Sequence, residues 1–153
     1  PTVGQAAPDF RLQDQSGNWV ALGDFRGKWL AVYFYPKADT PGCTKEACHF
    51  RDLASEFSAL GASRVGISTD RVEKQARFAD SQRFDYPLLS DADGTVAESF
   101  GVKRGLLGKF LPVKRTTFVI DSSGTVLDVI SSEVNMDTHA DKALEVLRER
   151  SSA

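Results

Sequence analysis

Both cysteines of this chain lie in one short stretch, TPGCTKEAC, residues 40–48. The residues before Cys43 are typical of a helix start, with Thr40 at the N-cap and Pro41 at the first helical position. In this arrangement the Thr40 hydroxyl accepts a hydrogen bond from the Cys43 amide. Cys43 then lies beside unpaired amides and the positive end of the helix dipole, and both favour the thiolate. Because the thiolate is the nucleophilic form of cysteine, the stretch indicates thiol chemistry at Cys43.

Helical periodicity separates the two thiols. Cys43 starts an apolar stripe that continues through Ala47, Phe50, Ala54 and Phe57. Cys48 falls about 140° around the helix from Cys43, on the polar side with Asp52 and Ser55. One thiol is therefore expected to face the interior and the other the solvent.

The spacing of the cysteines also limits how they can react with each other. Residues five apart in a helix have Cα atoms roughly 8 to 9 Å apart, whereas a disulfide needs less than about 7 Å. A bridge between Cys43 and Cys48 therefore requires the first turns of the helix to unwind. We interpret the two thiols as successive participants in one reaction cycle.

Three other interpretations of the cysteines remain open on the residues alone. Both could be unreactive buried side chains. Zinc binding by Cys43, Cys48, His49 and His139 is disfavoured because these side chains diverge around the helix and no CxxC or HxxxH pair is present. A thioredoxin-type exchange site normally uses CxxC, which is also absent. No metal or other cofactor is expected.

The elements around the cysteines predict an α/β protein. Alternating apolar residues and turn signals predict the following elements: a β-hairpin over 9–22, a central strand over 29–35, a helix over about 41–60, a buried strand over 64–68, a helix over 71–84, a short helix within 91–101, a hairpin of 115–121 with 125–131, and a last helix capped by Thr138 and Asp141. Strand, helix, strand is a parallel crossover unit. The sum is a mixed sheet with helices on both faces, compatible with a thioredoxin-like fold that carries an N-terminal β-hairpin extension.

Composition agrees with a single globular domain over residues 1–153. Hydrophobic residues make up 41% and charged residues 26% of the chain. A net charge of −2 gives no general reason to expect nucleic acid or an anionic membrane surface, and no apolar run approaches the roughly 20 residues of a membrane span. No signal peptide is visible, so a cytoplasmic location is expected, although a removed targeting segment would fit a chain that begins at Pro1. Trp19 and Trp29 are expected in the core.

Residues 36–48, PKADTPGCTKEAC, resemble the PxxxTxxC active-site signature of peroxiredoxins. The longer stretch TPGCTKEACHFRD is similar to the bacterioferritin-comigratory-protein, or peroxiredoxin Q, group. The resemblance extends to APDFRLQDQSG, VYFYPK, LLSDADGTVAESFGV and RTTFVID, and so covers most of the chain. It implies a thioredoxin fold and thiol-dependent reduction of hydrogen peroxide and organic hydroperoxides.

The resemblance also implies roles for five side chains. Cys43 matches the peroxidatic cysteine, and Pro36 and Thr40 match the other two motif residues. Arg115 matches the active-site arginine, and Cys48 matches the resolving cysteine of members that carry it in the same helix. The implied cycle forms a Cys43 sulfenic acid and then an intramolecular disulfide, which thioredoxin or a similar dithiol reduces. The group's resolution within one chain favours a monomer.

One segment departs from the family pattern. Residues 103–114, KRGLLGKFLPVK, together with Arg115 contain five basic residues and no acidic one. The segment is either a solvated loop or a lip that meets substrate or reductase. It leaves the preferred substrate open.

Two other functions also stay open: a thiol-disulfide oxidoreductase acting on protein disulfides and a non-catalytic thioredoxin-fold interaction module.

Overall fold

The computed structural model describes residues 1–104 and 112–151. Its strands are β1 (Arg11–Gln13), β2 (Trp19–Ala21), β3 (Trp29–Phe34), β4 (Ala62–Ser68), β5 (Leu88–Ser90), β6 (Thr116–Ile120) and β7 (Val126–Ser131). Its helices are the 3-10 turn η1 (Leu22–Phe25) and α1 (Pro41–Asp52), α2 (Ala54–Ala59), α3 (Val72–Gln82), α4 (Thr95–Ser99) and α5 (Asp137–Ser151). Within the described ranges, no helix is both long enough and apolar enough to cross a bilayer.

The strands form one mixed sheet in the order β2-β1-β5-β4-β3-β6-β7. The central strands β3, β4 and β5 are parallel to their neighbours in this group, and the β1–β2 and β6–β7 hairpins are antiparallel. The chain crosses from β3 to β4 through α1 and α2, which is the predicted parallel crossover. The predicted mixed sheet with an N-terminal hairpin is confirmed.

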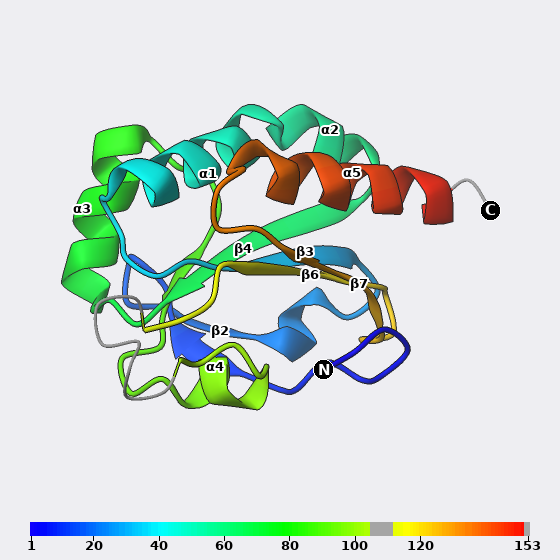
Figure 1. Ribbon diagram of the computed structural model, residues 1–153, viewed down its shortest axis with the longest axis horizontal. Helices are drawn as coiled ribbons and strands as arrows, with labels where there is room; N and C mark the ends of the chain where they lie inside the picture. The colour runs from blue at the N-terminus through cyan, green and yellow to red at the C-terminus, as the bar shows by residue number, and fades with distance from the viewer. Residues whose placement is uncertain (105–111, 152–153) are drawn as a thin grey trace.

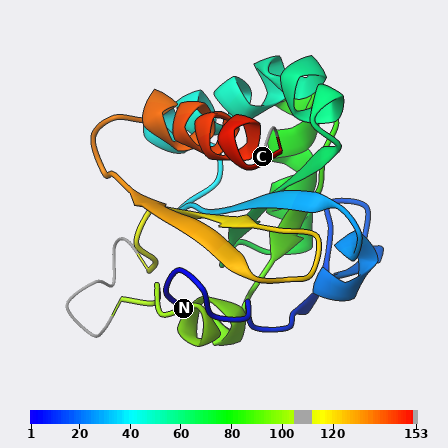
Figure 2. The same cartoon turned by 90° about the vertical axis from the view of Figure 1, so that its right-hand side faces the viewer.

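Helices cover both faces of this sheet (Figures 1 and 2). Ala31 and Tyr33 of β3 face a core shared with α1, α2, α3 and α5, whereas Leu30, Val32 and Phe34 face a second core shared with α4 and the N-terminal segment. This alternation explains why the strand reads as a continuous apolar run, since both of its faces are buried.

A chain of hydroxyl groups fixes α1 to the sheet. The Tyr33 and Tyr86 hydroxyls lie 2.7 Å apart, and the Tyr86 hydroxyl donates to the Ala47 carbonyl of α1 at 2.7 Å. The Tyr33 ring also stacks on the Phe50 ring at a centroid distance of 4.4 Å. Gly66 makes room for Tyr33, because an added Cβ would lie 2.8 Å from its ring. The cysteine helix is therefore held rigidly at its middle.

The prediction of one helix over 41–60 is wrong. The helix is interrupted at Leu53, which separates α1 from α2. Arg64 of β4 donates to the Phe50 carbonyl at 2.9 Å. In an unbroken helix that carbonyl would accept from the amide of Ala54, four residues on. A tertiary contact thus competes with the local helical bond at the break.

Three smaller expectations also differ from the structure. The three-residue strand β5 is not predicted, because so short a buried run carries little periodicity. The last helix begins at Asp137, so Thr138 lies in its first turn and not at the N-cap. Trp19 is 54% exposed, with the Arg11 guanidinium 4.4 Å from its ring, whereas Trp29 is half-buried against the core.

Candidate active site

Cys43 lies fully buried in the first turn of α1, directly after the carboxyl end of β3. The chain passes from β3 through the buried Pro36 to Asp39, whose φ of 64° is left-handed. Thr40 is extended at the N-cap and its carbonyl accepts from the Thr44 amide at 2.8 Å. The predicted helix start and the burial of Cys43 are confirmed.

The predicted hydrogen bond from the Cys43 amide to the Thr40 hydroxyl is wrong. The Thr40 hydroxyl instead donates to the Lys37 carbonyl at 2.7 Å, and no side chain caps the helix there. The tight turn of residues 37–40 brings that carbonyl within reach and so competes for the hydroxyl. The amides of the first turn are therefore left for another oxygen.

Arg115, which lies at the start of the strand next to β3, contacts the Cys43 thiol. Its Nη2 atom lies 3.3 Å from Cys43 Sγ, and its Nη1 atom donates to Glu46 Oε1 at 2.7 Å. Arg115 directly precedes β6, and the register pairs Phe34 at the end of β3 with Thr116. This pairing places the guanidinium at the start of α1.

Gly42 lies next to two side chains of the site. A Cβ added to Gly42 would lie 3.4 Å from Arg115 Nη2 and 3.5 Å from Met136 Sδ, which are ordinary van der Waals contacts. The position of Arg115 beside the first turn therefore does not depend on glycine at this residue.

The sequence analysis missed Glu46 and considered His139 only as a zinc ligand. Both are fully buried, and Glu46 Oε2 lies 3.5 Å from His139 Nδ1. The same ring nitrogen is 2.8 Å from the Thr117 hydroxyl, and Nε2 is 2.9 Å from the Ser132 carbonyl. A signal was present in the sequence, since Glu46 follows Cys43 by three positions and so shares the buried side of the helix.

Burial raises the pKa of Glu46 to about 8 from its ordinary 4.5. The charge and hydrogen bonds of Arg115 act in the opposite direction, and the nearby charge of Glu133 adds to the rise. Desolvation exceeds the attraction of Arg115 because the carboxyl is fully enclosed. Burial therefore favours the protonated form of Glu46 near neutral pH.

The raised pKa of Glu46 predicts that the protein loses stability as pH rises. Between pH 4.5 and about 8 the native state holds a proton that the unfolded chain has released, so the free energy of unfolding falls with pH across this window. The loss is at most about 5 kcal/mol. Glu46→Gln, which cannot titrate, is expected to lack this slope in urea unfolding of the reduced protein.

The comparison with Glu46→Gln isolates this one group. Burial lowers the pKa of His139, so its contribution to stability has the opposite sign and is lost as pH falls through the acid range. Above the ordinary histidine pKa of 6.5 His139 is neutral in both the folded and the unfolded chain, so the slope due to Glu46 is measured between pH 6.5 and about 8. Parallel pH profiles for the two proteins in that range would contradict the assignment.

Cys48 is more sheltered than expected. Its thiol is half-buried and lies 3.4 Å from Gln82 Oε1 at the end of α3, where Arg51 donates to the Gln82 carbonyl at 2.6 Å. The expectation that it faces solvent is wrong because α3 covers that side of α1. Burial raises the pKa of the Cys48 thiol, with a smaller rise from Asp52. Both cysteines are free thiols.

The basic segment is only partly described. Lys103 lies 3.9 Å from Glu98 and Arg104 lies 2.9 Å from Glu133, so both are paired with acids outside the segment. Lys114 is exposed. Residues 105–111, which include Lys109, lie outside the described part of the chain. The substrate or reductase lip considered for this segment therefore stays a prediction.

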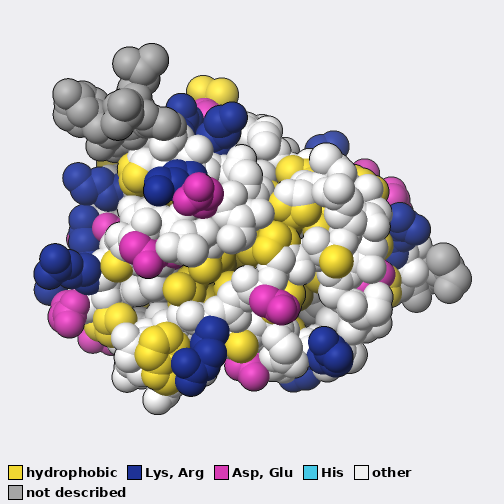
Figure 3. Space-filling view, turned by 90° about the horizontal axis from the view of Figure 1, so that it is seen from below, with side chains coloured by type: hydrophobic (Ala, Val, Ile, Leu, Met, Phe, Trp, Pro, Cys, Tyr) yellow, Lys and Arg dark blue, Asp and Glu magenta, His cyan; other side chains and the backbone are white. Residues whose placement is uncertain are grey.

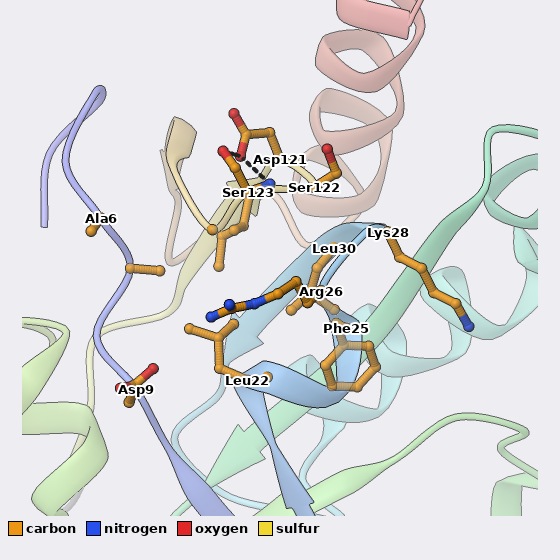
Figure 4. A pocket seen from close by; sticks show the side chains of 14 residues that line it. Ala6, Asp9, Leu22, Phe25, Arg26, Lys28, Leu30, Asp121, Ser122 and Ser123 are labelled. Carbon is orange, nitrogen blue, oxygen red and sulfur yellow. Dashed lines mark hydrogen bonds between the residues drawn. The ribbon is translucent and has the colours of Figure 1, made fainter.

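A cavity of about 260 Å³ lies away from the cysteines. Figure 4 shows Arg26 and Leu22 between the N-terminal segment and the turn at Asp121 to Ser123. None of the side chains around Cys43 lines it.

The face that carries α4 shows apolar, basic and acidic side chains interspersed, in the part of it that the structure describes (Figure 3).

Known proteins are similar to this chain in sequence and fold. A model of the AhpC/TSA family matches residues 3–129. A putative peroxiredoxin of Mycobacterium tuberculosis is 66% identical over 150 residues, which cover 95% of this chain and 96% of the relative. The crystal structure of peroxidoxin BcpB from M. tuberculosis superposes with a TM-score of 0.91, 64% identity and 97% coverage of both chains. The bacterioferritin comigratory protein of Xanthomonas campestris superposes with a TM-score of 0.89, 32% identity and 99% coverage of both.

Proposed function

Since the chain belongs to the AhpC/TSA family and is a peroxiredoxin, a thiol-dependent peroxidase, we propose that Cys43 is its peroxidatic cysteine and Cys48 its resolving cysteine. The observation that carries this assignment is the 3.3 Å contact of Arg115 Nη2 with the buried Cys43 Sγ. A guanidinium against a thiol at a helix N-terminus favours the thiolate and provides donors for a second oxygen. The arrangement suits attack on a peroxide.

The proposed substrates are hydrogen peroxide and organic hydroperoxides. The bacterioferritin comigratory protein of X. campestris has alkyl peroxide reduction activity. In this chain the Arg115 Nε atom is buried without a hydrogen-bond partner among the described residues. An unpaired donor on a charged group supports binding of a small, oxygen-rich molecule at this point.

In the first step the Cys43 thiolate attacks one peroxide oxygen. The S–O bond forms as the O–O bond breaks, and the other oxygen leaves as hydroxide or alkoxide and takes a proton from water. Charge grows on this leaving oxygen, so Arg115 and the first amides of α1 stabilise the transition state. Thr40 is proposed to orient the peroxide and Pro36 to shield the site, and the product is a Cys43 sulfenic acid.

In the second step the first turns of α1 open and Cys48 attacks the sulfenic sulfur, which releases water and forms the disulfide. Opening is required because the two Cα atoms are roughly 8 to 9 Å apart in the intact helix. The left-handed Asp39 and the sequence Pro41-Gly42 make this end of the helix its weak point. Opening also exposes Cys48 and removes the burial that raises its pKa.

In the third step an external dithiol, thioredoxin or a relative, reduces the disulfide by two thiol exchanges. Both cysteines lie on one chain, so the cycle needs no second copy and the proposed unit is a monomer. A reducing compartment such as the cytoplasm would supply the dithiol.

One equivalent of hydrogen peroxide added to the reduced protein tests the proposal. The expected product has lost two hydrogen atoms, and peptide mapping by mass spectrometry should locate a bridge between Cys43 and Cys48. Rapid formation of that bridge supports the peroxidase. Slow or absent oxidation would contradict it and favour a disulfide oxidoreductase or a non-catalytic module.

Cys48→Ser is expected to separate the two half-reactions. The variant should still consume one equivalent of peroxide and gain one oxygen atom at Cys43, because Cys48 takes no part in the first step. It should fail to turn over with thioredoxin, since no disulfide forms. Peroxide consumption is followed alongside thioredoxin oxidation, and full thioredoxin-linked turnover would refute the resolving role.

A further inference from the structure

Inside the site one cation, Arg115, contacts two acidic groups, the Glu46 carboxyl and the Cys43 thiol. Glu46 Oε1 accepts from Arg115 at 2.7 Å, while Oε2 is buried and has no hydrogen-bond partner among the described residues. An ionised carboxylate with one oxygen unpaired in the interior carries a large desolvation cost. His139 Nδ1 lies 3.5 Å from that oxygen, within ion-pair distance but without a hydrogen bond to it.

The contacts of His139 define which nitrogen carries its proton. The Ser132 carbonyl can only accept, so Nε2 at 2.9 Å must donate to it. In the neutral ring Nδ1 is then an acceptor, and the Thr117 hydroxyl at 2.8 Å donates to it. The single lone pair of Nδ1 is then shared between the Thr117 hydroxyl and any proton on Glu46 Oε2, whereas a proton on Nδ1 would face both the carboxylate and the Thr117 oxygen.

We propose that Glu46 and His139 hold one buried proton between them, and that this proton leaves the charge of Arg115 available to the Cys43 thiolate. With the proton in place the Glu46–His139 pair is neutral, and the positive charge of Arg115 balances the negative charge of the Cys43 thiolate. Without it, Glu46 and Cys43 compete for a single guanidinium in a low-dielectric interior. The inference rests on the proposed role of Cys43 and makes Glu46 and His139 positioning residues that act through Arg115.

The remaining groups around Glu46 do not supply a second positive charge. Glu133, before α5, accepts from the Arg115 amide at 3.0 Å and adds negative charge. The buried phenols of Tyr33, on β3, and Tyr86, just before β5, interact electrostatically with Glu46, and burial raises the pKa of both above its ordinary value of 10. Among the described residues, Arg115 is thus the cation that Glu46 and Cys43 share.

This arrangement predicts an alkaline limb in the reaction with peroxide. The raised pKa of Glu46, about 8, places the loss of the shared proton just above neutral pH. Once that proton is lost to solvent, the Glu46 carboxylate attracts the Arg115 guanidinium more strongly. Arg115 then stabilises the charge on the leaving oxygen less. The rate of Cys43 oxidation should therefore fall several-fold above about pH 8 in Cys48→Ser, and should stay flat in Cys48→Ser with Glu46→Gln.

Glu46→Gln is a close mimic of the protonated acid. Its amide oxygen can accept from Arg115, and its amide NH₂, like the protonated carboxyl, places a hydrogen on the side of His139 Nδ1. Two readouts in the Cys48→Ser background need no peroxide. Infrared difference spectra should show a protonated carboxyl band at neutral pH that titrates with a midpoint near 8 and is absent in Glu46→Gln. The midpoint of the ultraviolet titration of the Cys43 thiolate should differ by less than about twofold in proton concentration between Cys48→Ser and Cys48→Ser with Glu46→Gln.

A matched control and a measurement on the unmodified chain complete the test. Glu133→Gln removes the other nearby carboxylate and should keep the infrared band. Nitrogen NMR shifts of His139 should show the neutral ring protonated at Nε2. An absent carboxyl band, a thiolate titration displaced about tenfold or more to acid in Glu46→Gln, or the opposite tautomer would each overturn the proposal. Because these readouts do not involve turnover, they are independent of whether the protein reduces peroxide.

Discussion

Cys43→Ser is expected to lower the rate of peroxide reduction by at least about 10³-fold. Serine has nearly the same shape, so the buried site and its contact with Arg115 should persist. A serine hydroxyl stays protonated at neutral pH, however, and it cannot form the sulfenic acid from which the cycle continues. The rate at which the reduced protein consumes its first equivalent of peroxide, without added reductant, measures the effect.

Cys48→Ser is the matched control for this substitution. It makes the same chemical change five positions along the same helix, yet it should leave the first oxidation intact. Thermal unfolding of both variants shows whether the fold is retained. A residual rate in Cys43→Ser within about tenfold of the starting protein would mean that another group attacks the peroxide.

Arg115→Met is expected to slow the first oxidation of Cys43 by about 10²- to 10³-fold. Methionine keeps much of the apolar volume and removes the charge beside Cys43 Sγ and Glu46 Oε1. The thiolate then loses its cation, and the leaving oxygen loses a donor in the transition state. Rapid-mixing measurements of Cys43 oxidation at several peroxide concentrations separate this loss from weaker binding.

Arg104→Met and Arg115→Lys are the comparisons for Arg115→Met. Arg104 pairs with Glu133 at 2.9 Å on the surface nearby, so its loss should change the rate by less than about threefold. Lysine restores the charge but cannot donate through parallel nitrogens to two partners, so rescue should be partial. Equal rates for Arg115→Met and Arg104→Met would remove Arg115 from the mechanism.

The local sequence determined the parts of the site that depend on neighbouring residues. The Thr40-Pro41-Gly42 run predicts where α1 begins, and helical phase predicts that Cys43 is buried. The apolar run that became β3 likewise predicts a strand covered on both faces. These features follow from dihedral preferences and periodicity, which act over a few residues.

Tertiary structure decided the contacts between distant residues. Arg115 reaches Cys43 across 72 positions because β6 pairs with β3 in one register, which no local pattern specifies. The resemblance to a family pointed to Arg115 but not to His139, which reaches Glu46 through the packing of α5. The same kind of contact broke the helix after α1, where Arg64 takes the Phe50 carbonyl.

The charge state of the site was also decided by tertiary structure. A glutamate three residues after a cysteine is ordinarily ionised, and the sequence offers no reason to expect otherwise. Only the enclosed position of Glu46, with one oxygen on Arg115 and the other near His139, makes the protonated form the stable one. Sequence determined where the reactive thiol lies, and tertiary structure determined which charges surround it, because desolvation depends on the whole enclosing fold.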